Sequence, residues 1–201
     1  MAATEPAIRA SYAKSVVGSM KLCSATERAA LLARLDPALR ASIREASLLD
    51  WISAHDFARL LKLVLEVLGP ARARAFWRGN LLRSLDRTLL SPLRLGAVAL
   101  YGESPGSLLR MAPQAWQLVG RHAGRCSTTD EPPDAFSLLF TELPAELRTP
   151  GWLPLWAGGS EACIELMKFT GSAEAELDAS EPGRVVVHVR WQPRRGQTSS
   201  P

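Results

Sequence analysis

Residues 149–191 constrain the fold most, because patterns typical of a helix and of strands follow one another there without a gap. Thr149 and Pro150 are typical of a helix start, with Thr as the N-cap and Pro at the first helical position. We expect a helix from Gly151 to Thr170, because apolar and small residues recur there at helical spacing, and we expect Gly171 to end it. The residues of this stripe are Trp152, Leu155, Trp156, Gly159, Ala162, Cys163 and Leu166.

Two segments after this helix alternate between apolar and polar residues, as strands with one buried face do. The first spans residues 173–177 and the second spans residues 185–191, and a turn containing Pro182 and Gly183 lies between them. The pattern predicts an antiparallel hairpin.

The first half of the chain carries several signals for the start of a helix. Ser24 and Glu27 match a capping box, and Asp36 with Pro37 matches an N-cap followed by proline. Ser53 opens the most apolar of these segments, which we expect to form a largely buried helix.

Residues 24–119 are therefore predicted to be mostly helical. The weak periodicity of residues 1–22 allows only a short helix or an extended piece near its end. Further along, the composition is typical of strands at residues 116–126 and 135–143, separated by a turn at residues 127–134.

The predicted fold class is α+β, with a helical N-terminal half packed on a C-terminal four-stranded antiparallel sheet. Residues 116–191 follow the order β-β-α-β-β in this prediction. We expect residues 1–191 to form a single domain, and residues 192–201, which are mostly polar, to be a disordered tail.

Charge is distributed unevenly along the chain, whose formal net charge is +4. Residues 70–125 hold nine arginines against Asp86 and Glu103, whereas residues 126–182 hold eleven acidic residues against two basic ones. Two interpretations stay open: a basic face for an anionic partner, or arginine-rich helices that pair with acidic residues elsewhere in the chain. Because the arginines are spread over several helices and no nucleic-acid-binding motif is present, we expect no nucleic-acid partner.

Composition also indicates where the protein works. No apolar run approaches the roughly 18 residues that a membrane-spanning helix needs, so we expect no transmembrane segment. The N-terminus lacks the apolar core of a signal peptide. The cysteines are odd in number and far apart, which favours a reducing cytoplasm over a disulfide framework. They are Cys23, Cys126 and Cys163.

Two patterns suggest enzyme or metal chemistry, and neither is complete. Residues 102–106 match G-x-S-x-G, but the backbone N–H that would bind an oxyanion after Ser104 is missing, because the next residue is Pro105. We expect Ser104 to cap a helix, and an esterase is a distant third hypothesis behind two non-enzymatic ones. His122 and Cys126 share a face, but no third ligand lies near them in the sequence, so we expect no metal site.

The small residues of the predicted helix at 151–170 lie among large aromatic ones, and this combination suggests a pocket against the sheet. Our leading hypothesis is a non-enzymatic sensory domain that binds an apolar small molecule or a lipid there. The alternative is a protein-interaction module, in which the same small-residue face meets a partner protein or a second copy in a homodimer. The candidate pocket residues are Trp116, Trp152, Trp156, Gly159, Cys163 and Phe169.

The order of these motifs resembles known proteins. The pattern Leu109-x-x-Ala-Pro-x-x-Trp116, the segment Trp156–Cys163, Gly171 and the hairpin that ends at Trp191 resemble a group of myxobacterial proteins of unknown function, about 200 residues long. More remotely, they are similar to the superfamily that includes vinyl-reductase-type domains, haem nitric-oxide-binding domains and small subunits of a vesicle-tethering complex. The resemblance implies an α+β fold, often dimeric, that holds a small molecule or lipid between helices and sheet, or serves as an interaction module.

The chain departs from this superfamily at two points. The Tyr-x-Ser-x-Arg motif of the haem branch is absent, since neither Tyr12 nor Tyr101 begins it. The hairpin at residues 172–191 has no cysteine, unlike many members of the vinyl-reductase branch. We therefore expect neither a haem cofactor nor a metal.

Overall fold

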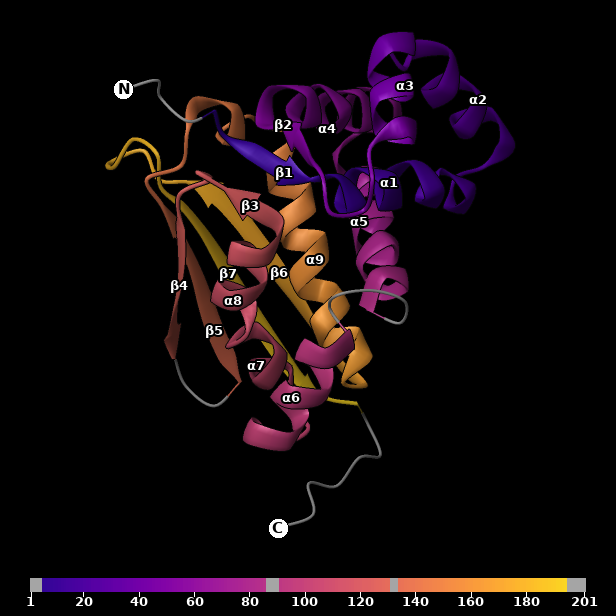
Figure 1. Ribbon diagram of the computed structural model, residues 1–201. Coiled ribbons are helices and arrows are strands. Elements are labelled where there is room, and N and C mark those ends of the chain that lie inside the picture. Colours follow the sequence, from indigo (N-terminus) through magenta and orange to yellow (C-terminus); the bar gives the residue numbers. More distant parts are fainter. Residues whose placement is uncertain (1–4, 86–90, 131–133, 195–201) are drawn as a thin grey trace.

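The computed structural model describes residues 5–85, 91–130 and 134–194 (Figure 1). Helices dominate the first part of the chain. Its elements are β1 (Ala7–Arg9), α1 (Ala10–Ser19), the 3-10 turn η1 (Met20–Leu22), α2 (Ala25–Arg34), α3 (Pro37–Glu45), β2 (Trp51–Ser53), α4 (Ala54–Leu68), α5 (Pro70–Leu85), α6 (Ser91–Tyr101), α7 (Pro105–Leu109) and α8 (Ala112–Val119).

Strands dominate the second part, interrupted by one long helix. The elements are β3 (Gly120–Arg121), β4 (Arg125–Asp130), β5 (Ala135–Thr141), the 3-10 turn η2 (Ala145–Leu147), α9 (Trp152–Leu166), β6 (Phe169–Leu177) and β7 (Val185–Pro193). The predicted α+β class is confirmed.

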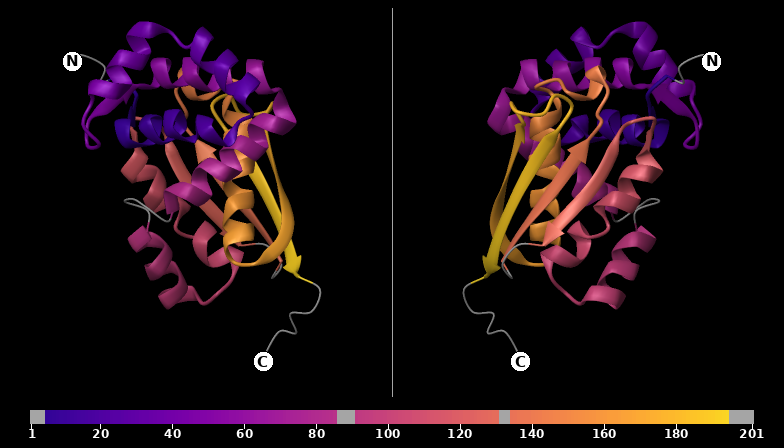
Figure 2. Two further views of the ribbon diagram at one scale, coloured as in Figure 1. Left: turned by 90° about the vertical axis from the view of Figure 1, so that its right-hand side faces the viewer. Right: turned by 90° about the vertical axis from the view of Figure 1, so that its left-hand side faces the viewer.

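Four of these strands form an antiparallel sheet in the order β4-β5-β7-β6. The predicted hairpin is present, with Leu177 opposite Val185 and Gly171 opposite Trp191. Side chains of β7 alternate as the sequence predicts, because every second residue from Val185 to Trp191 is buried while His188 and Arg190 are exposed. The sheet therefore has an inner face and an outer, solvated face, and the outer one is turned to the viewer in the right-hand view of Figure 2.

A second, three-stranded sheet in the order β2-β1-β3 was not predicted. Its strands are two or three residues long, too short for an alternating pattern to be recognised. Ala7 pairs with Ser53 on one side and with Arg121 on the other. This sheet connects the N-terminal helices to the end of α8. Trp51 therefore lies in a strand within the region that was predicted to be mostly helical.

The predicted strand at 116–126 was also wrong. Residues up to Val119 belong to α8, and the chain reaches β4 through β3 and a tight turn in which His122 has φ 51°. Pro113 lies in the first turn of α8, where its missing N–H costs nothing, so it favours a helix start here. The predicted turn at 127–134 is strand as far as Asp130, and residues 131–133 lie outside the described part.

Both ends of α9 differ from the prediction. The Oγ1 of Thr149 is buried without a hydrogen-bond partner among the described residues, and the helix begins at Trp152, whose N–H donates to the Thr149 carbonyl. The helix ends at Leu166 instead of Thr170. Gly171 lies within β6, where a Cβ would overlap the carbonyl oxygen of Arg190, so this glycine allows close strand pairing.

Gln192 and Pro193, which were predicted to belong to a disordered tail, are part of β7. Residues 195–201 lie outside the described part. Residues 7–19 are also more regular than the prediction for residues 1–22 allowed, since β1 and α1 follow one another directly from Ala7.

Helix α9 lies on the inner face of the sheet, with α5 beside it (Figure 2, left). Gly158 makes this contact possible, because a Cβ there would overlap the carbonyl oxygen of Arg74 and lie 3.0 Å from the amide nitrogen of Arg78. Beside the glycine, the Nε of Arg74 donates to Glu161 at 3.0 Å, and the side chain of Glu161 is mostly buried. This part of the small-residue face of α9 is therefore occupied within the chain.

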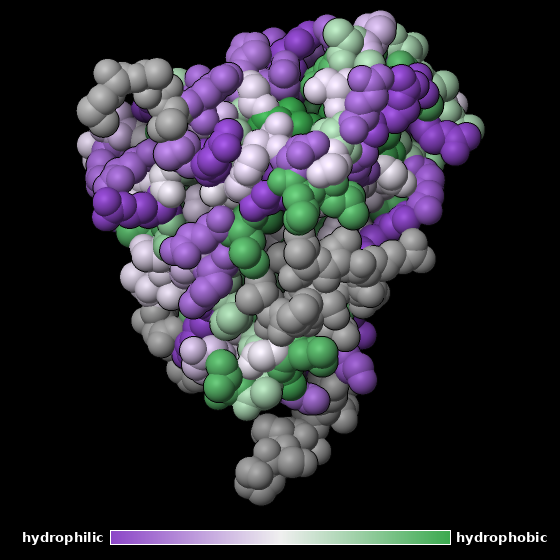
Figure 3. All heavy atoms as spheres, in the orientation of Figure 1, coloured by the Kyte–Doolittle hydropathy of each residue, from purple (hydrophilic) through white to green (hydrophobic). Residues whose placement is uncertain are grey.

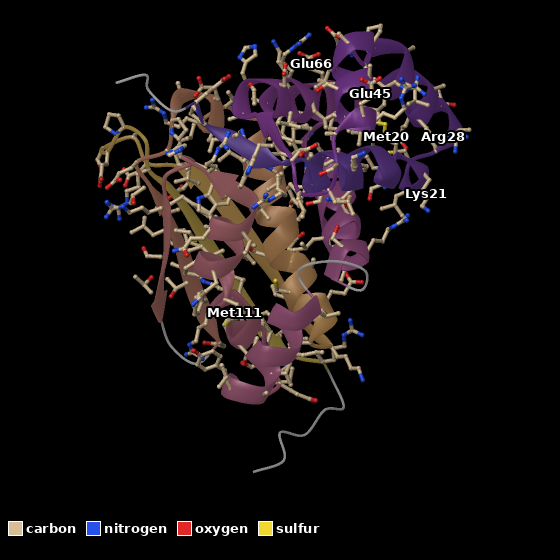
Figure 4. All side chains as sticks on the ribbon, viewed as in Figure 1. Met20, Lys21, Arg28, Glu45, Glu66 and Met111 are labelled. Carbon is tan, nitrogen blue, oxygen red and sulfur yellow. The ribbon has the colours of Figure 1, made fainter. Side chains whose placement is uncertain are left out.

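Ion pairs support the second interpretation of the charge pattern. Arg72 pairs with Glu27 at 3.1 Å, and Arg78 pairs with Glu165 at 3.5 Å, so arginines of the basic segment meet acidic residues of other helices. Charged side chains such as Glu66 lie on the outside of the N-terminal helices (Figure 4). Among the helices of the described segments, none combines the length and the apolar character that crossing a membrane requires.

Replacing Gly158 by Ala should destabilise the protein by about 1–3 kcal/mol, because the added methyl group meets backbone atoms of α5 that cannot move independently. Gly159→Ala is the matched control, since a Cβ there meets only Leu81 Cδ2 at 3.6 Å. The control should be neutral or up to about 1 kcal/mol more stable, through helix propensity. Urea unfolding of both variants measures the difference, and equal stabilities would contradict the close packing of α9 on α5.

Stability should also depend on the protonation of Glu27. Its hydrogen bond from Arg72 and those from Ser24 lower the pKa of Glu27 from 4.5 to about 2. The unfolded state therefore binds a proton at higher pH than the folded state, and the stabilisation is present above about pH 4.5 and is lost as the pH falls to about 2. Denaturant midpoints measured across this range should fall less steeply for Glu27→Gln than for the unmodified protein. Parallel curves would show that the carboxylate contributes nothing to the fold.

Candidate functional site

A pocket of about 180 Å³ lies on the inner side of the sheet, between α9 and the α7–α8 segment. Both helical segments cover the same face of the strands in Figure 1. Leu138 and Phe140 of strand β5 line the pocket, and so does Tyr12 of α1. Met111, between α7 and α8, also lines the pocket and marks its position in Figure 4.

Aromatic rings form the core of this site. The ring of Trp156 is stacked on that of Phe140 with centroids 4.8 Å apart, and it lies 5.5 Å from the ring of Trp152. The ring of Trp116 is edge-on to both tryptophans, at 6.3 Å from Trp152 and 6.5 Å from Trp156. The three tryptophans therefore meet where the helices face the sheet, as the sequence predicted. Such ring contacts make this side of the pocket apolar and hold its side chains in fixed positions.

Five of the six predicted pocket residues are brought together around this space. Three are the tryptophans, and the other two are Gly159 and Cys163, one helical turn apart on α9. Phe169 is not part of the lining. It lies at the start of β6, opposite Pro193, because α9 ends before it.

Apart from Trp116 of α8, the prediction missed the contributions of α1, α7, α8 and β5. Residues of α7 and α8 that line the pocket recur at intervals of three or four, a pattern typical of one helix face. They are Leu108, Leu109, Met111, Ala112, Ala115, Trp116 and Val119. The strand predicted from residue 116 interrupted this face at its end. The sequence around Tyr12 gave no signal, because its place depends on the unpredicted strand β1.

Few polar atoms border the pocket. Trp152 Nε1 is satisfied, because it donates to the carbonyl oxygen of Glu146 at 3.0 Å. The Nε1 atoms of Trp116 and Trp156 are buried and have no hydrogen-bond partner among the described residues. Burial raises the pKa of Tyr12 and raises that of Cys163 to about 12, so both groups are neutral at physiological pH.

The other sequence candidates lie outside this pocket. Ser104 caps α7, because its Oγ accepts the N–H of Ser107 at 3.3 Å, and it follows helix α6 and not a strand. His122 is exposed in the turn before β4, whereas Cys126 lies in that strand. In residues 5–85, 91–130 and 134–194, no three histidine, cysteine or acidic side chains converge as a metal site would require.

Comparison with known proteins identifies relatives of the fold alone. No protein-family model matches the sequence, and the comparison with curated protein sequences gave no match. Among solved structures, the chain is similar to an oxygen-binding H-NOX domain related to soluble guanylate cyclases (TM-score 0.59, 14% identity, covering 96% of this chain and 100% of that one). It is also similar to a variant of Tt H-NOX (TM-score 0.61, 15% identity, 96% and 100% covered) and to a mutant of H-NOX from T. tengcongensis (TM-score 0.55, 14% identity, 91% and 97% covered). The architecture is thus that of H-NOX domains over nearly the whole chain.

Cys163 provides a test of the burial of the site. In a protein carrying Cys23→Ser and Cys126→Ser, the remaining thiol should react with iodoacetamide at pH 8 about a thousandfold more slowly than in urea, because so little thiolate forms at a pKa of about 12. The native rate should rise about tenfold per pH unit between pH 8 and 10, whereas the unfolded rate should level off near pH 9. A native rate close to the unfolded one would place Cys163 on the surface.

Proposed function

We propose that the protein is a non-enzymatic sensory domain that binds an apolar small molecule in the pocket between α9 and the sheet. The observation that carries this proposal is the pocket itself, which has an aromatic wall and a floor of small residues on α9. Apolar walls with few polar atoms are typical of sites for small, mostly hydrophobic ligands.

The likeness to H-NOX domains supports a sensory interpretation at the level of the fold. One of these neighbours is described as an oxygen-binding domain, and another structure concerns haem distortion in the H-NOX family. At 14% identity, a shared fold carries over the architecture but no ligand. The ligand class must come from the residues of this pocket.

Those residues do not fit a haem. Within the described parts of the chain, the side chains of the pocket lining that could ligate iron are Tyr12, Met111 and Cys163, and none is a histidine. The thiol of Cys163 and the hydroxyl of Tyr12 both stay protonated, because burial raises the pKa of each. No lysine or arginine whose side chain the structure describes lines the pocket to pair with the two carboxylates of a haem.

The size of the pocket favours a compact ligand over a long-chain lipid. Engineered apolar cavities of roughly 150 Å³ hold a benzene molecule. A pocket of about 180 Å³ therefore accommodates a single substituted ring or a molecule of similar volume.

The position of the pocket is suited to signalling. Its walls come from α1, α8 and α9, and α8 leads directly into β3, which pairs with β1. In this proposal, a ligand that separates Trp116 from Trp156 also displaces the small sheet that connects the N-terminal helices to the rest of the chain.

One observation favours the alternative, a protein-interaction module. Helix α6 exposes Leu95, Leu100 and Tyr101, and Figure 3 shows hydrophobic atoms gathered around it at the lower end of that face. An apolar group of this kind on a surface is typical of a contact with another protein. This surface is separate from the small-residue face of α9, which is packed within the chain.

Binding can be tested with α-methylstyrene, a neutral apolar molecule of one substituted ring. Gly159→Leu should reduce its affinity at least tenfold, because the new side chain projects into the pocket from a position with free space. Gly18→Leu is the matched control, since it makes the same change at an exposed helical glycine of α1 and should leave affinity unchanged. Ligand-detected NMR measures both affinities, and circular dichroism checks the fold.

The same samples, with one further variant, separate the two proposals. Light scattering after size exclusion should give one oligomeric state for the unmodified protein and for Gly159→Leu. If no binding of α-methylstyrene is detected and Leu100→Ser, which changes the exposed apolar surface of α6, alters the oligomeric state, the pocket proposal is wrong and the interaction module is favoured.

A further inference from the structure

The hydroxyl groups that border the pocket make no hydrogen bonds within the described chain. Tyr12 contributes only a ring contact with Phe57, at 5.7 Å, and its hydroxyl is bonded to no described residue. Ser160 is buried on α9 and lines the pocket, and it lacks the bond to the carbonyl four residues earlier that Ser84 makes with Asn80 at 2.9 Å. Neither hydroxyl oxygen is among the buried atoms without a partner, so both are accessible from the pocket, where a ligand can replace water as their hydrogen-bond partner.

The neighbouring indole groups are further hydrogen-bond donors without a partner in the described chain. The Nε1–H groups of Trp116 and Trp156 can only donate, and both are buried without an acceptor among the described residues. Ser and Tyr hydroxyl groups can donate as well. These hydroxyl groups can also accept, but the indole groups cannot, so an acceptor on a ligand would find several donors at this site.

The site lacks a charged partner. Among the described residues, the pocket lining contains no aspartate, glutamate, lysine, arginine or histidine. A carboxylate or an ammonium group on a ligand would lose its hydration and gain no opposite charge, which is strongly unfavourable. The acceptor must belong to a neutral group such as a ketone, an aldehyde, an ester or an ether.

Building on the proposed function, we propose that the pocket selects neutral, ring-sized molecules that carry a hydrogen-bond acceptor, and that the hydroxyl of Tyr12 donates to this acceptor. Tyr12 is suited to this role because α1 holds it at the edge of the aromatic cluster, in contact with Phe57. Its phenol stays protonated, and therefore a donor, because burial raises its pKa. Ser160 provides a second hydroxyl group on the α9 side.

Three probes of the same size separate the contributions. Acetophenone carries a neutral carbonyl, α-methylstyrene replaces its oxygen by CH₂, and benzoate replaces its methyl group by a charged oxygen. Acetophenone should bind about tenfold more tightly than α-methylstyrene, since one additional hydrogen bond to a buried donor has about this effect. Benzoate should bind at least tenfold more weakly than acetophenone.

Tyr12→Phe removes only the hydroxyl group and keeps the ring beside Phe57. It should reduce the affinity for acetophenone about tenfold and leave the affinity for α-methylstyrene unchanged, so that the two probes bind alike. The melting temperature should not fall, because the hydroxyl makes no bond in the protein alone. Tyr101→Phe is the matched control, since this exposed tyrosine is not part of the pocket lining.

Ligand-detected NMR titrations of all three probes distinguish the possible failures. If acetophenone and α-methylstyrene bind the unmodified protein equally, the pocket is confirmed but its selectivity for an acceptor is refuted. If Tyr12→Phe leaves the preference for acetophenone intact, Tyr12 is not the donor. If none of the probes binds, the proposed function fails together with this inference.

Discussion

The close packing of α9 between α5 and the sheet determines the rest of this structure. Gly158 lets the backbones of α9 and α5 approach one another, and the ion pair of Arg74 with Glu161 closes the same contact. Once α9 is held in this way, Trp152, Trp156 and Gly159 must face the other side, toward α8 and β5. Two adjacent glycines thus have different roles, because one allows a contact between backbones and the other leaves space.

The elements with strong local signals could be predicted from the sequence. The hairpin of β6 and β7 follows from the alternation of residues 173–177 and 185–191, and the caps at Ser24, Asp36 and Ser53 are formed by the side chains that the sequence indicated. In these segments, local preference and tertiary packing favour the same structure. Prediction of the three-tryptophan cluster succeeded for a related reason, since large aromatic residues on an apolar helix face are buried together.

The remainder depends on contacts that are distant in the sequence. Strands β1, β2 and β3 exist because they pair with one another, and Trp51 is held by the guanidinium of Arg9, 3.7 Å from its ring centroid. Helix α8 is eight residues long and rich in residues that also suit strands, so its neighbours decide its conformation. Because Tyr12 and the α7–α8 segment reach the pocket only through these elements, the sequence predicted one wall of the site and missed the opposite one.

This chain can share its fold with H-NOX domains and still have a pocket of its own, because different parts of the chain determine the fold and the pocket. The fold requires the buried alternation of β7 and the contact of α9 with α5, and neither involves the residues that a ligand would touch. The pocket residues can therefore change without loss of the architecture that this chain shares with H-NOX domains. In this chain, tryptophan rings occupy much of the inner face, and the remaining polar groups are neutral. Neutral donors in an apolar site interact more strongly with a dipolar ligand than donors in water do, because the local dielectric constant is low. A compact ketone or ester satisfies such a site better than an ion or a hydrocarbon does.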